Sequence, residues 1–501
     1  MESGTSVVYL SISIADFNSK SRVEDTASSS NHSLSFGTTP VNESDGEVEG
    51  FEMIQARPKS SNSSQHNENL TSEQVLEQMR YDYALFARDT GFSTFFDDVY
   101  PLQSRLVLAY VVEAFTTLGC SLANMTTGTQ LPLVKYLPHH ELLMKQLHII
   151  LEDGGLIEAS TERWIRTDKV VDLTSSSTIL KQILERHPKF KDEHYLLDIT
   201  GSKLAQCLNG SADPIRLLFA DKENRLCLER VYQSGPMYKA MTSMLAEFLK
   251  RCYANKPGRR IRILEIGGGT GGTTKFLSQF LLKSKVDFEY TFTDVSSALV
   301  TAAKRTFAGL SNMRYAILDI EKSPAEQHLA QYDTVISTNC IHATRDLTSS
   351  LANIRKMLQP DGFLALVEFT RNLFWFDLVF GLLDGWWRFR DGRNHPLASV
   401  DRWGQSLVEA GFSHYSFTSG ATEESRTLRI ISGFNNPASG ENKVKLAASQ
   451  RTIGEVKTVV WKSVKGLDLM ADIYLPKHRI SGDQPIGESH VHYPFTITDR
   501  R

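Results

Sequence analysis

Cysteine is sparse in this 501-residue sequence, and no pair of cysteines has the C-x-x-C spacing of a zinc or redox motif. The five that occur are Cys120, Cys207, Cys227, Cys252 and Cys340. Their odd number and scattered positions argue against a disulfide scaffold and a structural zinc site, and they fit a reducing compartment. We therefore expect a cytoplasmic protein without a metal centre.

Long apolar runs and a large excess of one charge are also missing. The N-terminus lacks the basic region and apolar run of a signal peptide. The most apolar stretch, residues 373–383, is too short to span a membrane and carries Asp377. A formal net charge of -3 gives no reason to expect nucleic acid or an anionic membrane as partner.

The chain is too long for one ordinary core, so we expect several parts. Residues 1–72 are rich in Ser and Asn and poor in apolar side chains, which predicts disorder. Residues 73–256 show apolar positions at three- and four-residue spacing, which predicts a mainly helical part with a small wing-like hairpin near residues 155–171. Residues 435–455 have the composition of a linker, and residues 456–501 are expected to form a hairpin followed by a polar tail.

Between residues 257 and 434, strand-like runs alternate with helical ones. This alternation is typical of an α/β fold with a parallel, doubly wound sheet, here of seven strands. The expected strands are residues 261–266, 288–293, 313–318, 332–337, 363–369, 414–417 and 427–432.

A glycine-rich turn follows the first of these strands, because residues 263–272 read ILEIGGGTGG. Glycine lets the backbone approach a ligand at positions where a Cβ would collide with it. We expect Gly267, Gly269 and Gly271 to contact a cofactor. The loop also satisfies the dinucleotide fingerprint G-x-G-x-x-G, so the glycines alone do not decide which cofactor binds.

Acidic residues at the strand ends favour S-adenosylmethionine. Glu265 precedes the glycines, where its carboxylate suits a cationic amino group and would repel a pyrophosphate. Asp319 closes the third strand, where it can accept a hydrogen bond from the adenine amino group. Asp294 closes the second strand and suits a ribose diol under either cofactor. The alternative is a tight strand–helix turn with no ligand.

A second group of polar residues follows the fourth strand, where residues 338–344 read TNCIHAT. The carboxyl ends of parallel strands form the ligand crevice of such sheets, so Asn339 and His342 should face the cofactor. Glu368 ends the fifth strand, and neighbouring strands lie about 4.8 Å apart, which would bring it within reach of His342. A histidine oriented by a carboxylate is a common general base. A histidine in a loop is more often only a structural hydrogen-bonding group.

Aromatic residues then crowd the segment after the fifth strand, including Trp375 and Trp386. An aromatic stripe usually belongs to a core helix. Because this one lies between a strand end and the next helix, where substrate lids are inserted, we expect both tryptophans to line an apolar substrate pocket.

Together these motifs resemble the C-methyltransferase domain of fungal non-reducing polyketide synthases, over residues 86–434. The motifs that carry the resemblance are YPLQ (100–103), AYVVEAF (109–115), LPHH (137–140), RVY (230–232), the glycine loop up to residue 274, NCIHAT (339–344) and DGR (391–393).

The resemblance implies a class I, Rossmann-like methyltransferase core preceded by a helical lid subdomain. It implies that S-adenosylmethionine is the cofactor and that His342 and Glu368 are the catalytic pair, with Tyr232 facing the substrate from the lid. The implied substrate is a polyketide thioester on an acyl carrier protein, methylated at its α-carbon within a larger synthase. Residues 456–476 look like the opening of an α/β-hydrolase release domain, and no G-x-S-x-G motif follows, so we expect a truncated piece without hydrolase activity.

Other functions use some of the same residues. An O-methyltransferase acting on a phenol would need the same histidine and cofactor loop, and a nicotinamide dehydrogenase would use the glycines. A domain that binds cofactor and acts only as a scaffold is the alternative that is not an enzyme.

Overall fold

A computed structural model describes residues 70–160, 163–253, 258–435, 456–464 and 467–474. The chain divides into two compact units, one up to Asn436 and one from Pro437 onward. The expected N-terminal disorder, the linker at 435–455 (except Asn435) and the tail after residue 474 lie outside the described residues.

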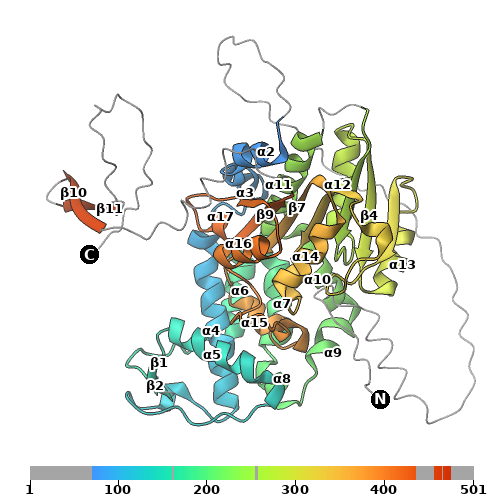
Figure 1. Cartoon of the computed structure of the whole chain (residues 1–501). Coiled ribbons are helices and arrows are strands. Elements are labelled where there is room, and N and C mark those ends of the chain that lie inside the picture. Colours follow the sequence, from blue (N-terminus) through green and yellow to red (C-terminus); the bar gives the residue numbers. More distant parts are fainter. Residues whose placement is uncertain (1–69, 161–162, 254–257, 436–455, 465–466, 475–501) are drawn as a thin grey trace, which may run out of the picture. The chain divides into compact units, whose positions relative to one another are not determined.

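The first half of the larger unit is mainly helical (Figure 1). Local signals fix several helix starts: Thr71 and Gln74 form a capping box, and Asp221 accepts a hydrogen bond from the backbone N–H of Asn224. The expected wing is present as an antiparallel pair of short strands, β1 (Ile157–Ser160) and β2 (Arg163–Arg166). The helices are α2 (Ser72–Met79), α3 (Tyr83–Thr90), α4 (Tyr100–Thr117), α5 (Glu141–Asp153), α6 (Ser176–Arg186), α7 (Lys191–Gly201), α8 (Leu204–Asn209), α9 (Pro214–Phe219), α10 (Lys222–Ser234) and α11 (Pro236–Tyr253).

A seven-stranded sheet with the order β5-β4-β3-β6-β7-β9-β8 forms the second half. The strands are β3 (Ile261–Ile266), β4 (Phe288–Asp294), β5 (Met313–Ile317), β6 (Tyr332–Thr338), β7 (Leu358–Phe369), β8 (His414–Phe417) and β9 (Leu428–Phe434). The helices that connect or flank them are α12 (Gly272–Lys283), α13 (Ser297–Thr306), α14 (Leu347–Met357), α15 (Trp375–Val379), α16 (Val400–Glu409) and α17 (Glu424–Thr427). The expected Rossmann-like α/β fold is therefore confirmed.

One strand differs from the expected parallel arrangement. β9 lies antiparallel to both β7 and β8, so the sheet is mixed. A parallel crossover needs about a dozen residues or more, usually with a full helix. Only the short α17 lies between β8 and β9, so the chain turns back and β9 enters the sheet in the opposite direction.

The helical half and the sheet share one hydrophobic core. α11 packs on β7, where the rings of Phe248 and Phe363 lie 5.4 Å apart between centroids. α3 packs against α11, and α2 packs against β8. The helical half is therefore joined to the sheet by apolar packing, and the boundary proposed at residue 256 stays a prediction.

The second unit contains one described feature, the antiparallel pair of strands β10 (Val456–Val464) and β11 (Leu467–Tyr474). This is the hairpin expected at that position. Its assignment to a truncated hydrolase domain stays a prediction.

Candidate active site

The glycine loop between β3 and α12 has the backbone geometry that only glycine adopts readily. Gly267, Gly269 and Gly271 have φ angles of 66°, 56° and 83°. A Cβ added to Gly268 would lie 2.2 Å from the ring of Phe292, so this position has no room for a side chain. A Cβ on Gly269 would meet nothing closer than 3.9 Å, so that side of the loop is open.

Glu265 lies beneath this loop and is 1% exposed. One of its carboxylate oxygens, Oε2, accepts hydrogen bonds from the hydroxyls of Thr274 and Tyr290. The other, Oε1, is buried without a partner in the described part of the chain. Burial raises the pKa of Glu265 to about 7, against the lowering effect of the two hydroxyls. A buried carboxylate oxygen with no donor suits a ligand that brings a cationic amino group.

The aspartates near the ends of β4 and β5, Asp294 and Asp319, have different surroundings. Asp294 is 1% exposed and accepts hydrogen bonds from the backbone N–H groups of Gly269 (3.1 Å) and Ser296 (2.8 Å). It therefore holds the glycine loop in place, and its contact with a ribose stays a prediction. Asp319 lies two residues beyond the end of β5 and forms an ion pair with Lys322 (3.0 Å). The sequence had placed it at the end of the strand itself.

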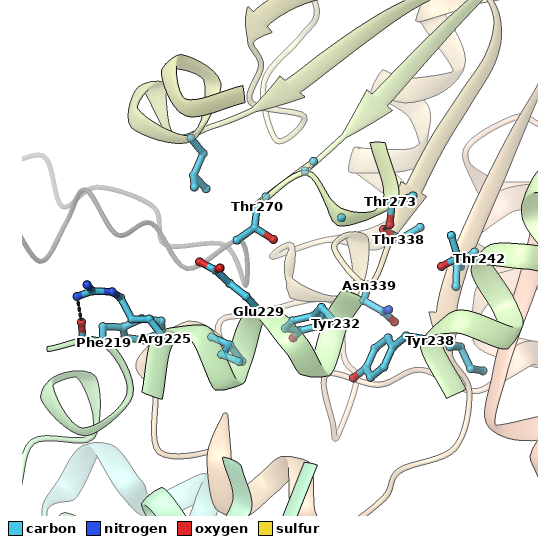
Figure 2. A pocket seen from close by; sticks show the side chains of 18 residues that line it. Phe219, Arg225, Glu229, Tyr232, Tyr238, Thr242, Thr270, Thr273, Thr338 and Asn339 are labelled. Atoms are coloured by element: carbon cyan, nitrogen blue, oxygen red, sulfur yellow. Dashed lines mark hydrogen bonds between the residues drawn. The ribbon is translucent and has the colours of Figure 1, made fainter. Parts of the chain in front are cut away.

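A cavity lies over the glycine loop. Figure 2 shows that its walls come from both halves of the unit: α10 and α11 on one side, and the glycine loop with the end of β6 on the other. Val367 of β7 also lines the cavity. The lining residues are Phe219, Arg225, Leu228, Glu229, Tyr232, Tyr238, Thr242, Gly267, Gly268, Gly269, Thr270, Gly272, Thr273, Leu299, Thr338, Asn339, Val367 and Leu428.

The contribution of α10 was missed by the sequence analysis, apart from Tyr232. Arg225 and Glu229 lie one turn apart on the face of α10 that borders the cavity (Figure 2). A Cβ on Gly272 would lie 2.8 Å from the side chain of Gln233, so α10 packs directly on the glycine loop. The sequence of α10 reads as an ordinary amphipathic helix, and nothing in it marks which face covers a ligand.

His342 and Glu368 form the contact that their strand positions predicted. β6 and β7 are neighbours, and His342 Nδ1 lies 2.6 Å from Glu368 Oε2. Glu368 Oε1 accepts hydrogen bonds from the backbone N–H groups of Cys340 (3.1 Å), Ile341 (2.8 Å) and His342 (3.4 Å). Since Nδ1 donates to the carboxylate, the lone pair is on Nε2, which is buried and has no partner among the described residues.

A second histidine–carboxylate pair, His395 and Asp377, differs from this one in how its second ring nitrogen is used. His395 Nε2 donates to Asp377 Oδ1 (2.9 Å), while its Nδ1 accepts a hydrogen bond from the backbone N–H of Leu397 (3.1 Å). Both of its ring nitrogens are therefore used, and this pair is structural. Of these two histidines, His342 is the one that combines an oriented ring with a ring nitrogen that has no partner among the described residues.

The expected catalytic pair, His342 and Glu368, lies close in the chain to residues of the cavity wall. His342 is 3% exposed and Glu368 is fully buried, but Asn339 and Val367, which line the cavity, are close to them in the chain. Tyr232 lines the cavity from α10, and burial together with the charge of Glu368 raises the pKa of its hydroxyl. The hydroxyl is therefore neutral and can donate a hydrogen bond in the site.

The other predicted residues are divided between the site and the core. Asn339 has a φ of 50°, and its side-chain oxygen is buried without a partner among the described residues. Trp386 lies edge-on to His342 with 5.7 Å between ring centroids. Trp375 is 1% exposed and packs on the rings of Phe376 and Phe380. Neither tryptophan lines the cavity, and substrate binding by them stays a prediction.

The described residues contain no group of three or more His, Cys, Asp or Glu side chains that could hold a metal ion. None of their helices has the length and hydropathy needed to cross a membrane.

Comparison with known proteins places these features in a family. Residues 77–164 match the model of the methyltransferase helix-turn-helix domain, and residues 264–364 match that of a methyltransferase domain. Over 416 residues the chain is 50% identical to the non-reducing polyketide synthase pkbA of Emericella nidulans. The match covers 83% of this chain and 16% of the synthase. The chain therefore spans about one sixth of the length of that relative.

Two solved structures share the fold over most of the larger unit. The CMeT domain of the citrinin polyketide synthase is 34% identical with a TM-score of 0.69, and the match covers 73% of this chain and 96% of that domain. The trans-methyltransferase CalH, solved in complex with SAH, is 25% identical with a TM-score of 0.50, over 66% of this chain and 90% of CalH. The chain belongs to the carbon-methyltransferase (CMeT) domains of polyketide synthases, and it is a methyltransferase.

Proposed function

We propose that this domain transfers a methyl group from S-adenosylmethionine to the α-carbon of a β-keto polyketide thioester carried on an acyl carrier protein. The observation that carries the proposal is the state of His342: its ring is held by Glu368, and its second nitrogen is buried and unpartnered beside the cavity. A base of this kind is required for carbon methylation, because the acceptor carbon must first lose a proton.

The chain's own residues support the cofactor assignment. Glu265 Oε1 has no donor among the described residues, Gly269 leaves the loop open toward the cavity, and Asp294 lies at the end of β4. SAH, which is bound in CalH, is what remains of S-adenosylmethionine after methyl transfer. When bound, S-adenosylmethionine supplies a methyl group on a cationic sulfur that a carbon nucleophile can attack.

The two flanking carbonyls of a β-keto thioester make its α-hydrogen acidic enough for an imidazole to remove. His342 Nε2 takes that proton, and Glu368 keeps the other ring proton on Nδ1 and stabilises the imidazolium that forms. The neutral hydroxyl of Tyr232 can donate a hydrogen bond to a carbonyl oxygen as it becomes enolate-like. General base catalysis of this kind contributes about 10²- to 10⁴-fold in rate.

The test is a comparison of substrates. Purified protein is incubated with S-adenosylmethionine and either a carrier-bound diketide or triketide thioester or free phenols, and the products are identified by mass spectrometry. The proposal predicts α-methylated carrier-bound product and unchanged phenols. Methylation of phenols alone would assign an O-methyltransferase, and cofactor binding without any product would assign a scaffold.

The wider setting follows from the relatives and is part of the same proposal. The carrier protein and the other domains of a non-reducing polyketide synthase would be the partners, because the matched region is a fraction of such a synthase. A cytoplasmic location stays a prediction.

A further inference from the structure

The loop that carries His342 is held on its N–H side by Glu368 and on its carbonyl side by a different residue. Arg393 lies 51 positions further along the chain, after the aromatic segment, and is 9% exposed. Its Nη1 donates to the carbonyl oxygen of His342 (2.9 Å), and its Nη2 donates to that of Thr344 (2.8 Å). The short turn between these carbonyls is the one that presents the imidazole.

The guanidinium is itself fixed from the opposite side. Its Nε donates to Asp391 Oδ1 (2.8 Å), and Nη1 also donates to the carbonyl oxygen of Pro396 (3.0 Å). Asp391 Oδ2 accepts a hydrogen bond from the backbone N–H of Leu347 (3.0 Å), the first residue of α14. Arg393 and Asp391 therefore tie the end of the catalytic loop and the start of the next helix to one buried ion pair.

Glu368 and Arg393 form hydrogen bonds with opposite sides of the same turn. Three backbone N–H groups bind the carboxylate, and two carbonyl groups bind the guanidinium. If the guanidinium is removed, those two carbonyls become buried acceptors without partners, and the turn gains freedom to rotate. Glu368 would still bond the imidazole and the N–H groups of the loop, but the carbonyl side of the loop would be unsupported.

We propose that Arg393 is a positioning residue for methyl transfer, which orients His342 Nε2 toward the acceptor carbon through the backbone carbonyls of the loop. This inference rests on the proposed function of His342 as the base. Arg393 does not line the cavity, and its contribution is to the geometry of the base. A displacement of about 1 Å of a catalytic group can cost about 10²-fold in rate.

The experiment compares three variants of the full chain with the wild type, measuring kcat and KM for a carrier-bound β-keto thioester and the Kd for S-adenosylmethionine. Arg393→Met removes all the donors, and Arg393→Lys keeps the charge and some of them. Arg402→Met is the matched control, because Arg402 also pairs with Asp391 (3.6 Å) and donates to its carbonyl oxygen (3.0 Å). Within the described residues, no hydrogen bond or ion pair links the Arg402 side chain to residues 339–344.

The expected result is that Arg393→Met lowers kcat about 10²-fold, with KM and the Kd for the cofactor within about twofold of wild type. Arg393→Lys should recover part of that loss, and Arg402→Met should stay within about threefold of wild type. Near wild-type kcat in folded Arg393→Met, or an equal loss in Arg402→Met, would overturn the inference. Failure of both Arg393 variants to fold would assign the residue to stability alone and would also overturn it. If the wild type itself methylates no carrier-bound substrate, the proposed function fails instead.

Discussion

Replacing Glu368 by glutamine tests how the carboxylate controls His342. The two side chains have nearly the same shape, but glutamine carries one acceptor and one donor group at its end. The carboxylate now accepts three backbone N–H groups on Oε1 and the imidazole Nδ1–H on Oε2. Only one orientation of the amide avoids placing its NH₂ group against three backbone donors.

In that orientation the amide oxygen keeps the three backbone bonds and the NH₂ group faces His342 Nδ1. The imidazole must then accept at Nδ1 and carry its proton on Nε2, which is the atom proposed to remove the substrate proton. The variant would keep the loop in place and lose the base. We expect kcat to fall by about 10²- to 10⁴-fold, equivalent to about 3–5 kcal/mol in activation free energy.

The assay is a single-turnover reaction with carrier-bound β-keto thioester, followed by mass spectrometry, together with calorimetric titration of S-adenosylmethionine. Cofactor affinity should stay within about twofold of wild type, because Glu368 does not line the cavity. Glu409→Gln, an exposed position on α16, is the control for a surface carboxylate. A rate for Glu368→Gln within about tenfold of wild type would refute the tautomer argument.

Three further predictions concern the cofactor loop and the lid. Gly269→Val should abolish cofactor binding in calorimetry while circular dichroism shows a folded protein. The position has a φ of 56°, which valine adopts only with strain, and the added side chain would enter the open side of the loop. Unchanged affinity would contradict the placement of the loop. The pKa of Glu265 is raised to about 7, and its ionised form is the one that binds an ammonium group, so the affinity for S-adenosylmethionine should fall as the pH drops through about 7. Glu265→Gln should bind the cofactor weakly and without this pH dependence. A pH dependence that persists in the variant would refute the role of Glu265. Burial, and secondly Asp192, raises the pKa of Glu193 to about 8, so the folded state holds a proton that the unfolded state has lost, and stability should decline as the pH rises from about 4.5 to about 8. Glu193→Gln should therefore raise the melting temperature at about pH 8 by several degrees, and a lower melting temperature there would contradict this account.

Much of the fold and of the site could be predicted because the signals are local. The strand, glycine turn and helix around Gly267 follow one another directly, and the neighbouring strands that carry His342 and Glu368 fix their distance. The direction of β9 could not be predicted in this way. It follows from the short connection between β8 and β9, and the alternation of strand-like and helical runs does not show the direction of a strand. The bonds from Arg393 to the loop of His342 join residues far apart in sequence, so no local pattern reveals them.

The roles of the two tryptophans in the aromatic segment could not be predicted from the sequence either. Trp375 and Trp386 have the same side chain and lie in the same insertion. Trp386 packs edge-on against His342, whereas Trp375 lies in an aromatic cluster of the core. Which of the two approaches the site depends on tertiary packing around α15, and composition alone could not separate them.

The most direct test of the central claim is single-turnover methylation by His342→Ala at saturating S-adenosylmethionine. The account predicts that the variant binds the cofactor with nearly wild-type affinity, because His342 does not line the cavity, and forms no α-methylated carrier-bound product on the timescale of the wild type. Product formed by His342→Ala at the wild-type rate would show that another group removes the proton and would contradict the account.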